Sequence, residues 1–235
     1  MKTYIRVMGV DFVLDPLYSI LKERIKPYII DKPLSEPLSL MIPDDKLPLF
    51  QARIGKVTLG ETEYLATGAL FNRKLLGYGA LMVHSSAVVV DGYCYSFTGD
   101  SGMGKSTHTG IYLKVFPNSF ILNDDKPIYR LDEKTNIVTA YGNPWSGKDD
   151  VSRNVSAPVK GLCFIEHGTT NEVRRLDQKE AVNRLINQVY RPENKNKLST
   201  TLELMGKLID HLPIYAIKCD ISTQAVKNSY QVMKG

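Results

Sequence analysis

Three features are scarce or missing in this sequence: cysteine, long apolar stretches and runs of basic residues. The cysteines, Cys94, Cys163 and Cys219, are odd in number, far apart and embedded in apolar, strand-like segments. This pattern favours reduced thiols in a core and argues against a disulfide framework or a zinc site. We therefore expect a protein of a reducing compartment.

No stretch approaches the roughly 18 consecutive apolar residues of a membrane span, and the chain reaches Asp11 and Asp15 before an apolar leader segment develops. The net charge is +5, but the basic residues are scattered and no Lys/Arg-rich run marks a nucleic-acid-binding patch. We expect a cytoplasmic protein that binds neither membranes nor nucleic acids, with a charge that suits an anionic ligand.

The composition, 43% hydrophobic and 23% charged over 235 residues, is that of an ordinary globular protein. Residues 3–8 predict a strand and residues 17–29 a short helix, whereas the prolines between positions 31 and 48 exclude long regular elements there. We expect a small β-rich N-terminal lobe over residues 1–78 and a main domain over 79–235, which can also form one continuous domain.

The most informative segment is a complete phosphate-binding loop, G-x-x-x-x-G-K-[ST], at residues 99–106. An alternating, strand-like run precedes it at 93–98, and helical spacing follows it at 107–116. The alternative is a glycine-rich surface turn. Because both the strand and the helix are in place, the pattern favours nucleotide binding.

Each residue type in this loop has a physical role. Glycine lets the backbone turn its N–H groups toward phosphate oxygens, and the helix directs its positive end at the same anion. Lys105 supplies a charge for the β- and γ-phosphates, Ser106 a hydroxyl for Mg²⁺, and Thr107 a hydroxyl within reach of the α-phosphate. The predicted nucleotide-binding residues are Gly99, Asp100, Ser101, Gly102, Met103, Gly104, Lys105, Ser106 and Thr107.

A hairpin is predicted directly before this loop. The apolar run 81–90 begins a sheet, and Asp91-Gly92, between two alternating runs, is a strong signal for a two-residue turn. Segments 86–90 and 93–98 should therefore pair antiparallel. The predicted fold class is α/β with a mixed sheet, in contrast to the parallel sheet of most phosphate-loop NTPases.

A pair of carboxylates follows the loop. An apolar strand over 119–122 ends in Asn123-Asp124-Asp125. At such a strand end one carboxylate can hold the metal bound to the phosphates while the other faces the incoming nucleophile. Asn-Asp-Asp is also turn-forming chemistry, so an Asx turn is the structural alternative. The upstream loop favours the functional interpretation.

Two further segments are candidates for the site. His84 stands with Ser85 and Ser86 just before the hairpin, where it can reach the phosphate site or serve as a hydrogen-bonded structural residue. The loop 142–148 places Trp145 beside Lys148. This loop can clamp phosphates or a peptide, or it can be a packed aromatic loop with solvated charges.

The remaining segments complete the α/β pattern. Asp177 and Glu180 form the signature of a capping box at the start of a helix. The expected helices are 61–76, 178–190, 198–211 and 222–233, and the expected strands are 127–131, 137–141, 159–165 and 214–218.

His84 ahead of a hairpin, the loop at 99–106 and Asn123-Asp124-Asp125 together resemble the catalytic domain of HPr kinase/phosphorylase, and more closely its short homologues associated with modified-peptide gene clusters. The order and spacing agree over roughly residues 80–130, and the tract 141–148 looks like the short homologues in particular. The resemblance implies a mixed-sheet P-loop fold related to the nucleotide-binding half of phosphoenolpyruvate carboxykinase.

The resemblance also implies roles for individual residues. Lys105 and Ser106 would bind phosphates and metal, and His84 would lie beside the metal or the γ-phosphate. Asp124 would accept the proton of the substrate hydroxyl, and Asp125 would help to bind Mg²⁺. The predicted catalytic residues are thus Asp124, Lys105 and His84, and the predicted metal ligands are Ser106 and Asp125.

The chain departs from the family in two places. The glycine-bearing signature associated with the phosphorylase reaction is not found after the second predicted hairpin, and His108 stands where the bacterial regulator usually has an acidic residue. Phosphorolysis of phosphoserine and the use of HPr as the substrate therefore do not follow from the resemblance.

These observations predict an ATP- and Mg²⁺-dependent kinase, with GTP as an alternative, that transfers the γ-phosphoryl group to a Ser or Thr hydroxyl of a peptide or small protein. A nucleotide-binding regulator that hydrolyses slowly or not at all, and a small-molecule kinase, are the open alternatives. HPr kinases assemble as hexamers, so the resemblance also implies a homo-oligomer.

Overall fold

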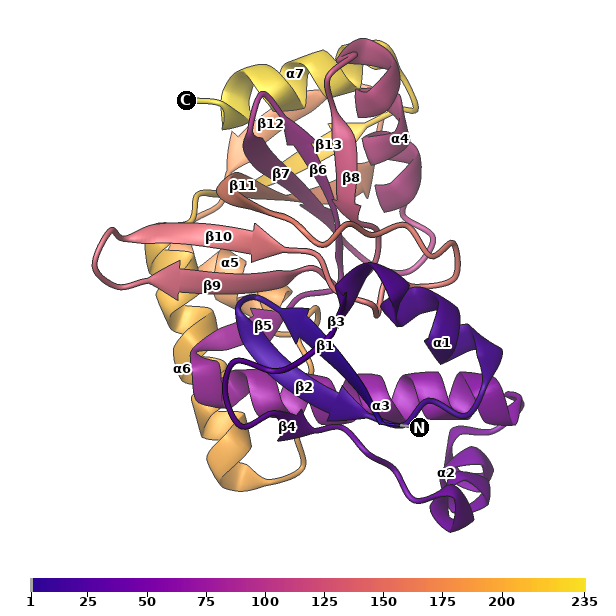
Figure 1. Cartoon of the computed structure of the whole chain (residues 1–235). Coiled ribbons are helices and arrows are strands. Elements are labelled where there is room, and N and C mark those ends of the chain that lie inside the picture. Colours follow the sequence, from indigo (N-terminus) through magenta and orange to yellow (C-terminus); the bar gives the residue numbers. More distant parts are fainter. Residues whose placement is uncertain (1) are drawn as a thin grey trace.

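The computed structural model describes residues 2–235, which form two β-sheets surrounded by helices (Figure 1). The strands are β1 (Thr3–Val7), β2 (Val10–Leu14), β3 (Ile29–Ile30), β4 (Leu38–Ser39), β5 (Ala80–Met82), β6 (Ser85–Val90), β7 (Tyr93–Thr98), β8 (Phe120–Asn123), β9 (Ile128–Asp132), β10 (Ile137–Tyr141), β11 (Ser156–His167), β12 (Glu172–Arg175) and β13 (Ile214–Cys219). The α-helices are α1 (Ser19–Ile25), α2 (Leu47–Ile54), α3 (Leu59–Leu75), α4 (Lys105–Val115), α5 (Gln178–Leu185), α6 (Lys195–His211) and α7 (Thr223–Met233).

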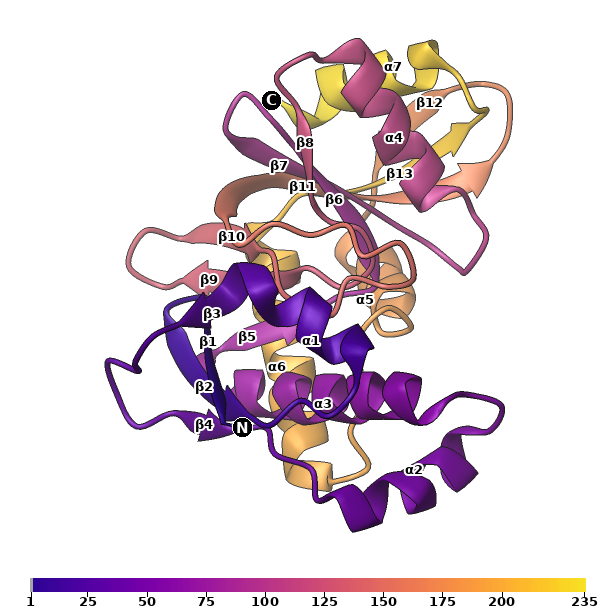
Figure 2. The same cartoon turned by 45° about the vertical axis from the view of Figure 1, so that its right-hand side comes forward.

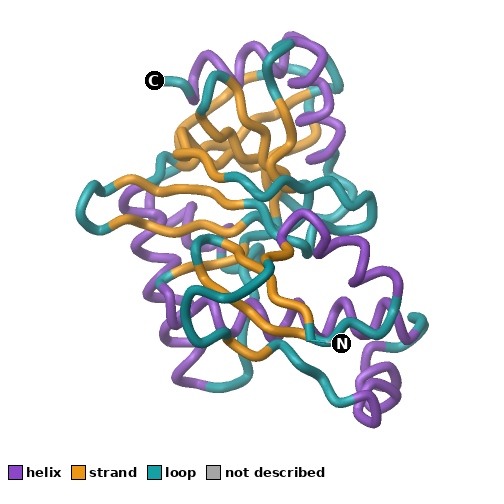
Figure 3. Tube along the Cα trace, in the orientation of Figure 1, coloured by secondary structure: helices purple, strands orange, loops and turns teal. Residues whose placement is uncertain are grey.

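The larger sheet is mixed, which confirms the α/β class predicted from the sequence. Its strands follow the order β5-β9-β10-β11-β7-β6-β8, and β13 and β12 continue from β11. Strands β7, β11 and β13 are parallel to one another, whereas β6 is antiparallel to both of its neighbours, β7 and β8. Figure 3 shows these strands crossing the molecule with helices at its periphery.

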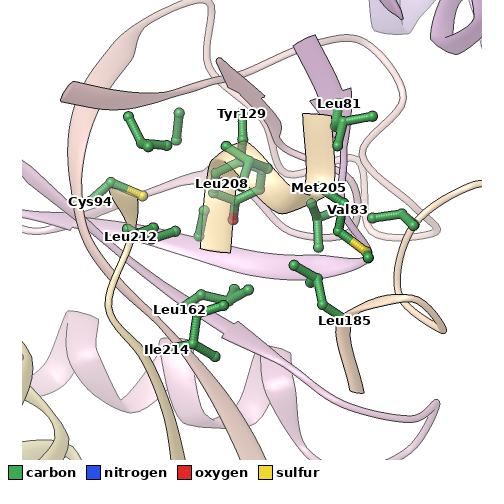
Figure 4. Close-up of a cluster of buried hydrophobic side chains, with 14 of the residues drawn as sticks. Leu81, Val83, Cys94, Tyr129, Leu162, Leu185, Met205, Leu208, Leu212 and Ile214 are labelled. Atoms are coloured by element: carbon green, nitrogen blue, oxygen red, sulfur yellow. The ribbon is translucent and has the colours of Figure 1, made fainter. Parts of the chain in front are cut away.

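Both faces of the central strands are buried, as expected for a sheet covered on two sides. On one face, Val88, Tyr95 and Phe97 pack against side chains of α4 and α7. The other face packs against α5 and α6 (Figure 4). The side chains labelled there are Leu81, Val83, Cys94, Tyr129, Leu162, Leu185, Met205, Leu208, Leu212 and Ile214.

The smaller sheet, β3-β1-β2-β4, is formed by the N-terminal residues and lies beside α3 (Figure 2). Its apolar core is shared with residues from other parts of the chain. Phe12 of β2 and Phe71 of α3 belong to one apolar cluster with Ala80, Met82 and Trp145, which lie beyond residue 78. The N-terminal elements are thus packed directly onto the segment that carries Trp145.

The apolar run 81–90, expected to begin the sheet, forms two strands that are separated at Val83-His84. Strand β5 pairs with β9, while β6 pairs with β7 and β8. The break arises because the two residues between the strands bond elsewhere: the amide of Val83 donates to Pro127 O at 3.3 Å, and that of His84 to Gln188 O at 2.7 Å. These partners come from distant segments, so apolar periodicity alone could not locate the break.

The expected helix over 178–190 is shorter and ends at Leu185. Of the two reciprocal hydrogen bonds of the expected capping box, one is formed. The Asp177 carboxylate accepts a bond from the amide of Glu180 at 2.8 Å. The Glu180 side chain does not return it, because it pairs with Arg174 and Arg184.

Two expectations from composition can be compared with the structure. All three cysteines are buried and unpaired, in agreement with core thiols. Among the α-helices of residues 2–235, none combines the length and the apolar character that a membrane crossing requires.

The predicted hairpin turn is present, and it provides a test of the fold. Asp91 and Gly92 have φ of +50° and +82°, the left-handed values of a two-residue turn that matches strand twist. Gly92→Ala should lower the free energy of unfolding by about 1 kcal/mol, because a Cβ disfavours this backbone region. Chemical denaturation measures the change.

Gly206→Ala, in the middle of α6, is the matched control. That glycine has ordinary helical geometry and open space around its Cβ position, so alanine should stabilise the protein by roughly 0.5–1 kcal/mol. Equal destabilisation by both substitutions would contradict the turn geometry.

Candidate nucleotide-binding site

The direction of β6 brings the predicted site residues together. Because β6 is antiparallel to both neighbours, its first residues lie where β7 and β8 end. In this register Ser85 is opposite Thr98, and Ala87 is opposite Asn123. The predicted phosphate loop, the Asp pair and His84 therefore meet at one edge of the sheet, although they are distributed over residues 84–125.

The phosphate loop has the backbone geometry expected from its glycines. Gly99, Gly102 and Gly104 have φ of +147°, +84° and +87°. At Gly99 an added Cβ would also lie 3.2 Å from the Ile165 carbonyl oxygen, so the close approach of β11 excludes a side chain. Helix α4 begins at Lys105 with no side chain capping it. Its first N–H groups are thus left to other partners, as at helix ends that bind anions.

The side chain of Lys105 folds back onto the backbone of residues 99–100. Its ammonium group donates to the carbonyl oxygens of Gly99 and Asp100, at 2.9 and 3.1 Å. Burial lowers the pKa of Lys105, and the nearby carboxylates of Asp125, Asp100 and Asp124 oppose that shift. Lys105 therefore remains within electrostatic range of both carboxylates of the Asp pair. Ser106 and Thr107 are exposed in the first turn of α4.

Asp124 is bonded to Ser86 and lies near the hydroxyl of Ser106. It accepts from the hydroxyl of Ser86 at the start of β6, and Ser86 Oγ lies 2.7 Å from Thr109 Oγ1 of α4. Burial raises the pKa of Asp124, and hydrogen bonds from Ser86 and Ser106 lower it. The strand tip, the start of β6 and the phosphate-loop helix are thus tied together around this carboxylate.

Asp125 faces a different set of groups. Its Oδ1 lies 3.5 Å from His84 Nε2, and its Oδ2 pairs with the ammonium of Lys126. His84 is oriented by Gln188, whose Oε1 lies 3.2 Å from Nδ1. Burial lowers the pKa of His84, and the charge of Lys105 adds to this effect. The imidazole is therefore neutral at pH 7.

The Asx turn that served as the structural alternative for Asn123-Asp124-Asp125 is present. Asn123 Oδ1 accepts from the amides of Asp125 and Lys126, at 3.1 and 2.8 Å. The fully buried asparagine forms the turn, so both carboxylates remain available for other contacts. The two interpretations of this segment therefore apply to different residues.

Trp145 is packed inside the protein and does not project from its loop. Its ring stacks on Phe71 with centroids 4.3 Å apart, and its Nε1 donates to Tyr64 O at 3.0 Å. The following turn reaches the Asp pair, because a Cβ at Gly147 would lie 2.7 Å from Asp125 Cβ. The loop thus shapes the site through its backbone.

His108 has a structural environment. It is buried against Phe97, and its Nε2 lies 3.2 Å from Ser229 Oγ. Burial lowers its pKa to about 4. A neutral ring thus packs in the core between α4 and α7.

The sequence did not single out several residues that shape the site. Ser86 could have been identified from the sequence, because a polar side chain within an apolar strand needs a hydrogen-bond partner. Gln188 and Thr109 could not, because only the tertiary fold brings them to His84 and Ser86.

A scan against protein-family models and a search of curated proteins found no match for this chain.

The environment of Trp145 can be tested by fluorescence, because it is the only tryptophan. With 2% of its surface exposed, Trp145 should be quenched weakly by acrylamide in the folded protein and strongly in denaturant. The Stern–Volmer constant measures the difference. Equal quenching in both states would show an exposed ring, as a ligand-clamping loop requires.

Proposed function

We propose that this chain is an ATP- and Mg²⁺-dependent kinase of the HPr kinase type, which phosphorylates a Ser or Thr hydroxyl of a peptide or small protein. One observation carries the proposal: the fold brings Asp124, which accepts from Ser86 and whose pKa the hydroxyl of Ser106 lowers, together with Asp125, whose Oδ1 lies 3.5 Å from His84 Nε2, at the phosphate loop. Phosphoryl transfer needs alignment and charge neutralisation more than covalent participation by the protein. These groups supply both.

The residues fit a magnesium-bound triphosphate. The glycine geometry and the uncapped start of α4 suit phosphate oxygens. A Mg²⁺ ion would neutralise phosphate charge, and it needs only one or two protein ligands. Ser106 and Asp124 would provide them.

The contacts support a division of labour that reverses the one implied by the family resemblance. The resemblance gives Asp124 the proton and Asp125 the metal. The hydroxyl of Ser106, however, lowers the pKa of Asp124, whereas Asp125 lies next to His84 and Lys126. We therefore assign Asp124 to the metal and Asp125 to the acceptor.

In the proposed reaction the acceptor hydroxyl oxygen forms a bond to the γ-phosphorus, and the bond from that phosphorus to the β,γ-bridging oxygen breaks. The hydroxyl proton passes to the Asp125 carboxylate, and the bridging oxygen leaves with ADP. Lys105 neutralises the charge that develops on the phosphates, and His84 Nε2, 3.5 Å from Asp125 Oδ1, lies beside the carboxylate that takes the proton.

Exchanging each carboxylate for an amide tests this division. Asp124→Asn should abolish the gain in nucleotide affinity that Mg²⁺ provides, because the metal-side carboxylate is lost. Asp125→Asn should retain Mg²⁺-dependent binding and lose phosphoryl transfer by about 10²-fold or more. Titration of ATP with and without Mg²⁺, combined with single-turnover assays, measures both effects. The opposite pattern would restore the assignment implied by the resemblance.

The kinase proposal depends on Lys105. Lys105→Ala should reduce transfer of label from γ-labelled ATP to an acceptor by about 10²-fold or more, since phosphate charge is no longer neutralised. Lys134→Ala, in the exposed turn between β9 and β10, is the matched control and should leave transfer unchanged. Full transfer by Lys105→Ala would end the proposal. Release of inorganic phosphate without a labelled acceptor would favour the regulator.

A further inference from the structure

A pocket of about 300 Å³ lies directly beside the strand tip. It shares His84 and Lys126 with the surroundings of Asp125, and Gln188, which holds His84, forms part of its wall. Gln188 also borders a second hollow, which contains Gly99 and Asp100 of the phosphate loop. The first pocket therefore opens next to the carboxylate that we assign to the acceptor.

The walls of this pocket are predominantly apolar. Its floor includes Trp145 and Met82, which are buried, and its rim includes Leu65 and Tyr190, which are 42% and 44% exposed. Exposed large apolar side chains around a concavity are typical of a binding surface. Ala69 of α3 contributes a small side chain to the wall.

One polar group in the wall has no partner. Asn72 of α3 is 8% exposed, and its Oδ1 accepts no hydrogen bond from the described residues. A buried polar atom without a partner is uncommon, and because Asn72 lines the pocket, a rotation of its carboxamide toward a ligand that donates to it would recover the lost interaction. A carboxamide has one donor group and one acceptor group, and a peptide group offers the matching pair.

We propose, on the basis of the kinase function above, that this pocket binds the acceptor as a peptide segment. An apolar side chain adjacent to the phosphorylated Ser or Thr would occupy the space between Ala69 and Trp145. The peptide group of the segment would pair with the Asn72 carboxamide. The acceptor hydroxyl would then lie at the mouth of the pocket, near Asp125 and His84.

A library of serine peptides with γ-labelled ATP tests the proposal. One flanking position at a time is fixed as Leu, Phe, Asp or Lys. At one position Leu and Phe should give several-fold more labelling than Asp, because the pocket walls are apolar. Equal labelling with all four residues would overturn the pocket assignment.

Filling the pocket is the second arm. Ala69→Leu should remove the preference for Leu and Phe while leaving ATP affinity unchanged. Ala66→Leu, on the same helix but outside the pocket lining, is the matched control and should keep the preference. A preference that survives in Ala69→Leu would place the apolar subsite elsewhere.

The unpaired amide gives the third arm. Asn72→Leu should raise the KM for the best peptide by about tenfold, the loss expected for one hydrogen bond, with kcat and ATP affinity retained. Its unfolding midpoint should not fall, because leucine leaves no unpaired carbonyl. Asn196→Ala, exposed on α6, should change neither value. An unchanged KM in a folded Asn72→Leu variant would exclude the peptide-group contact.

Calorimetric binding of the same Leu- and Asp-flanked peptides separates this inference from the proposed function. Preferential binding of the Leu peptide that Ala69→Leu abolishes, without any phosphate transfer, would support the pocket and overturn the kinase function. Transfer without a preference for an apolar residue would support the kinase and overturn the pocket.

Discussion

The direction of a single strand governs the site. Because β6 runs against both β7 and β8, its first residues meet the last residues of its two neighbours. Ser86 can then bond Asp124 at the tip of β8 and contact Thr109 of α4. If β6 were parallel to these strands, its first residues would lie at the opposite edge, and the Asp pair would lose the hydroxyl that holds it. The hairpin turn that reverses the chain before β7 is therefore required for this arrangement of residues as well as for the fold.

The strand tip itself is held by amide and hydroxyl groups that do no chemistry. Asn123 forms the turn through its oxygen and donates through its nitrogen to Asn143 O at 3.1 Å and Ser152 Oγ at 3.3 Å. The amide of Asp124 donates to Val151 O at 3.0 Å. With the backbone fixed in this way, the two carboxylates are displayed in different directions without bonding to each other. Because the buried polar groups around the strand tip are hydrogen-bonded, they hold the backbone that carries the two carboxylates in a fixed position, as a pre-organised charged site requires.

The features that could be predicted from the sequence are those encoded within a few neighbouring residues. Asp91-Gly92 predicts its hairpin because only certain residues adopt two successive positive φ values, and the glycines of 99–104 predict a loop for the same reason. The break at Val83-His84 coincides with backbone bonds to Pro127 and to Gln188, and Gln188 is 104 positions from His84. Trp145 illustrates the same limit: its loop composition fitted both a clamp and a packed ring, and its partner Phe71 comes from a helix that composition did not connect to it.

Contacts in the core connect the N-terminal strands and α1 to the loop beside Asp125. Phe12 of the small sheet touches Phe71 at a centroid distance of 5.0 Å, and Phe71 stacks on Trp145. Arg24 of α1 donates to Gly147 O, and this glycine abuts Asp125. A continuous path of contacts thus leads from the first strands to the proposed acceptor carboxylate. Helix α3 carries Phe71 on this path and Asn72 in the neighbouring pocket, so the same helix would both support the strand tip and select what approaches it. On this view the N-terminal region is the acceptor-side half of the site, and the phosphate loop is the donor-side half.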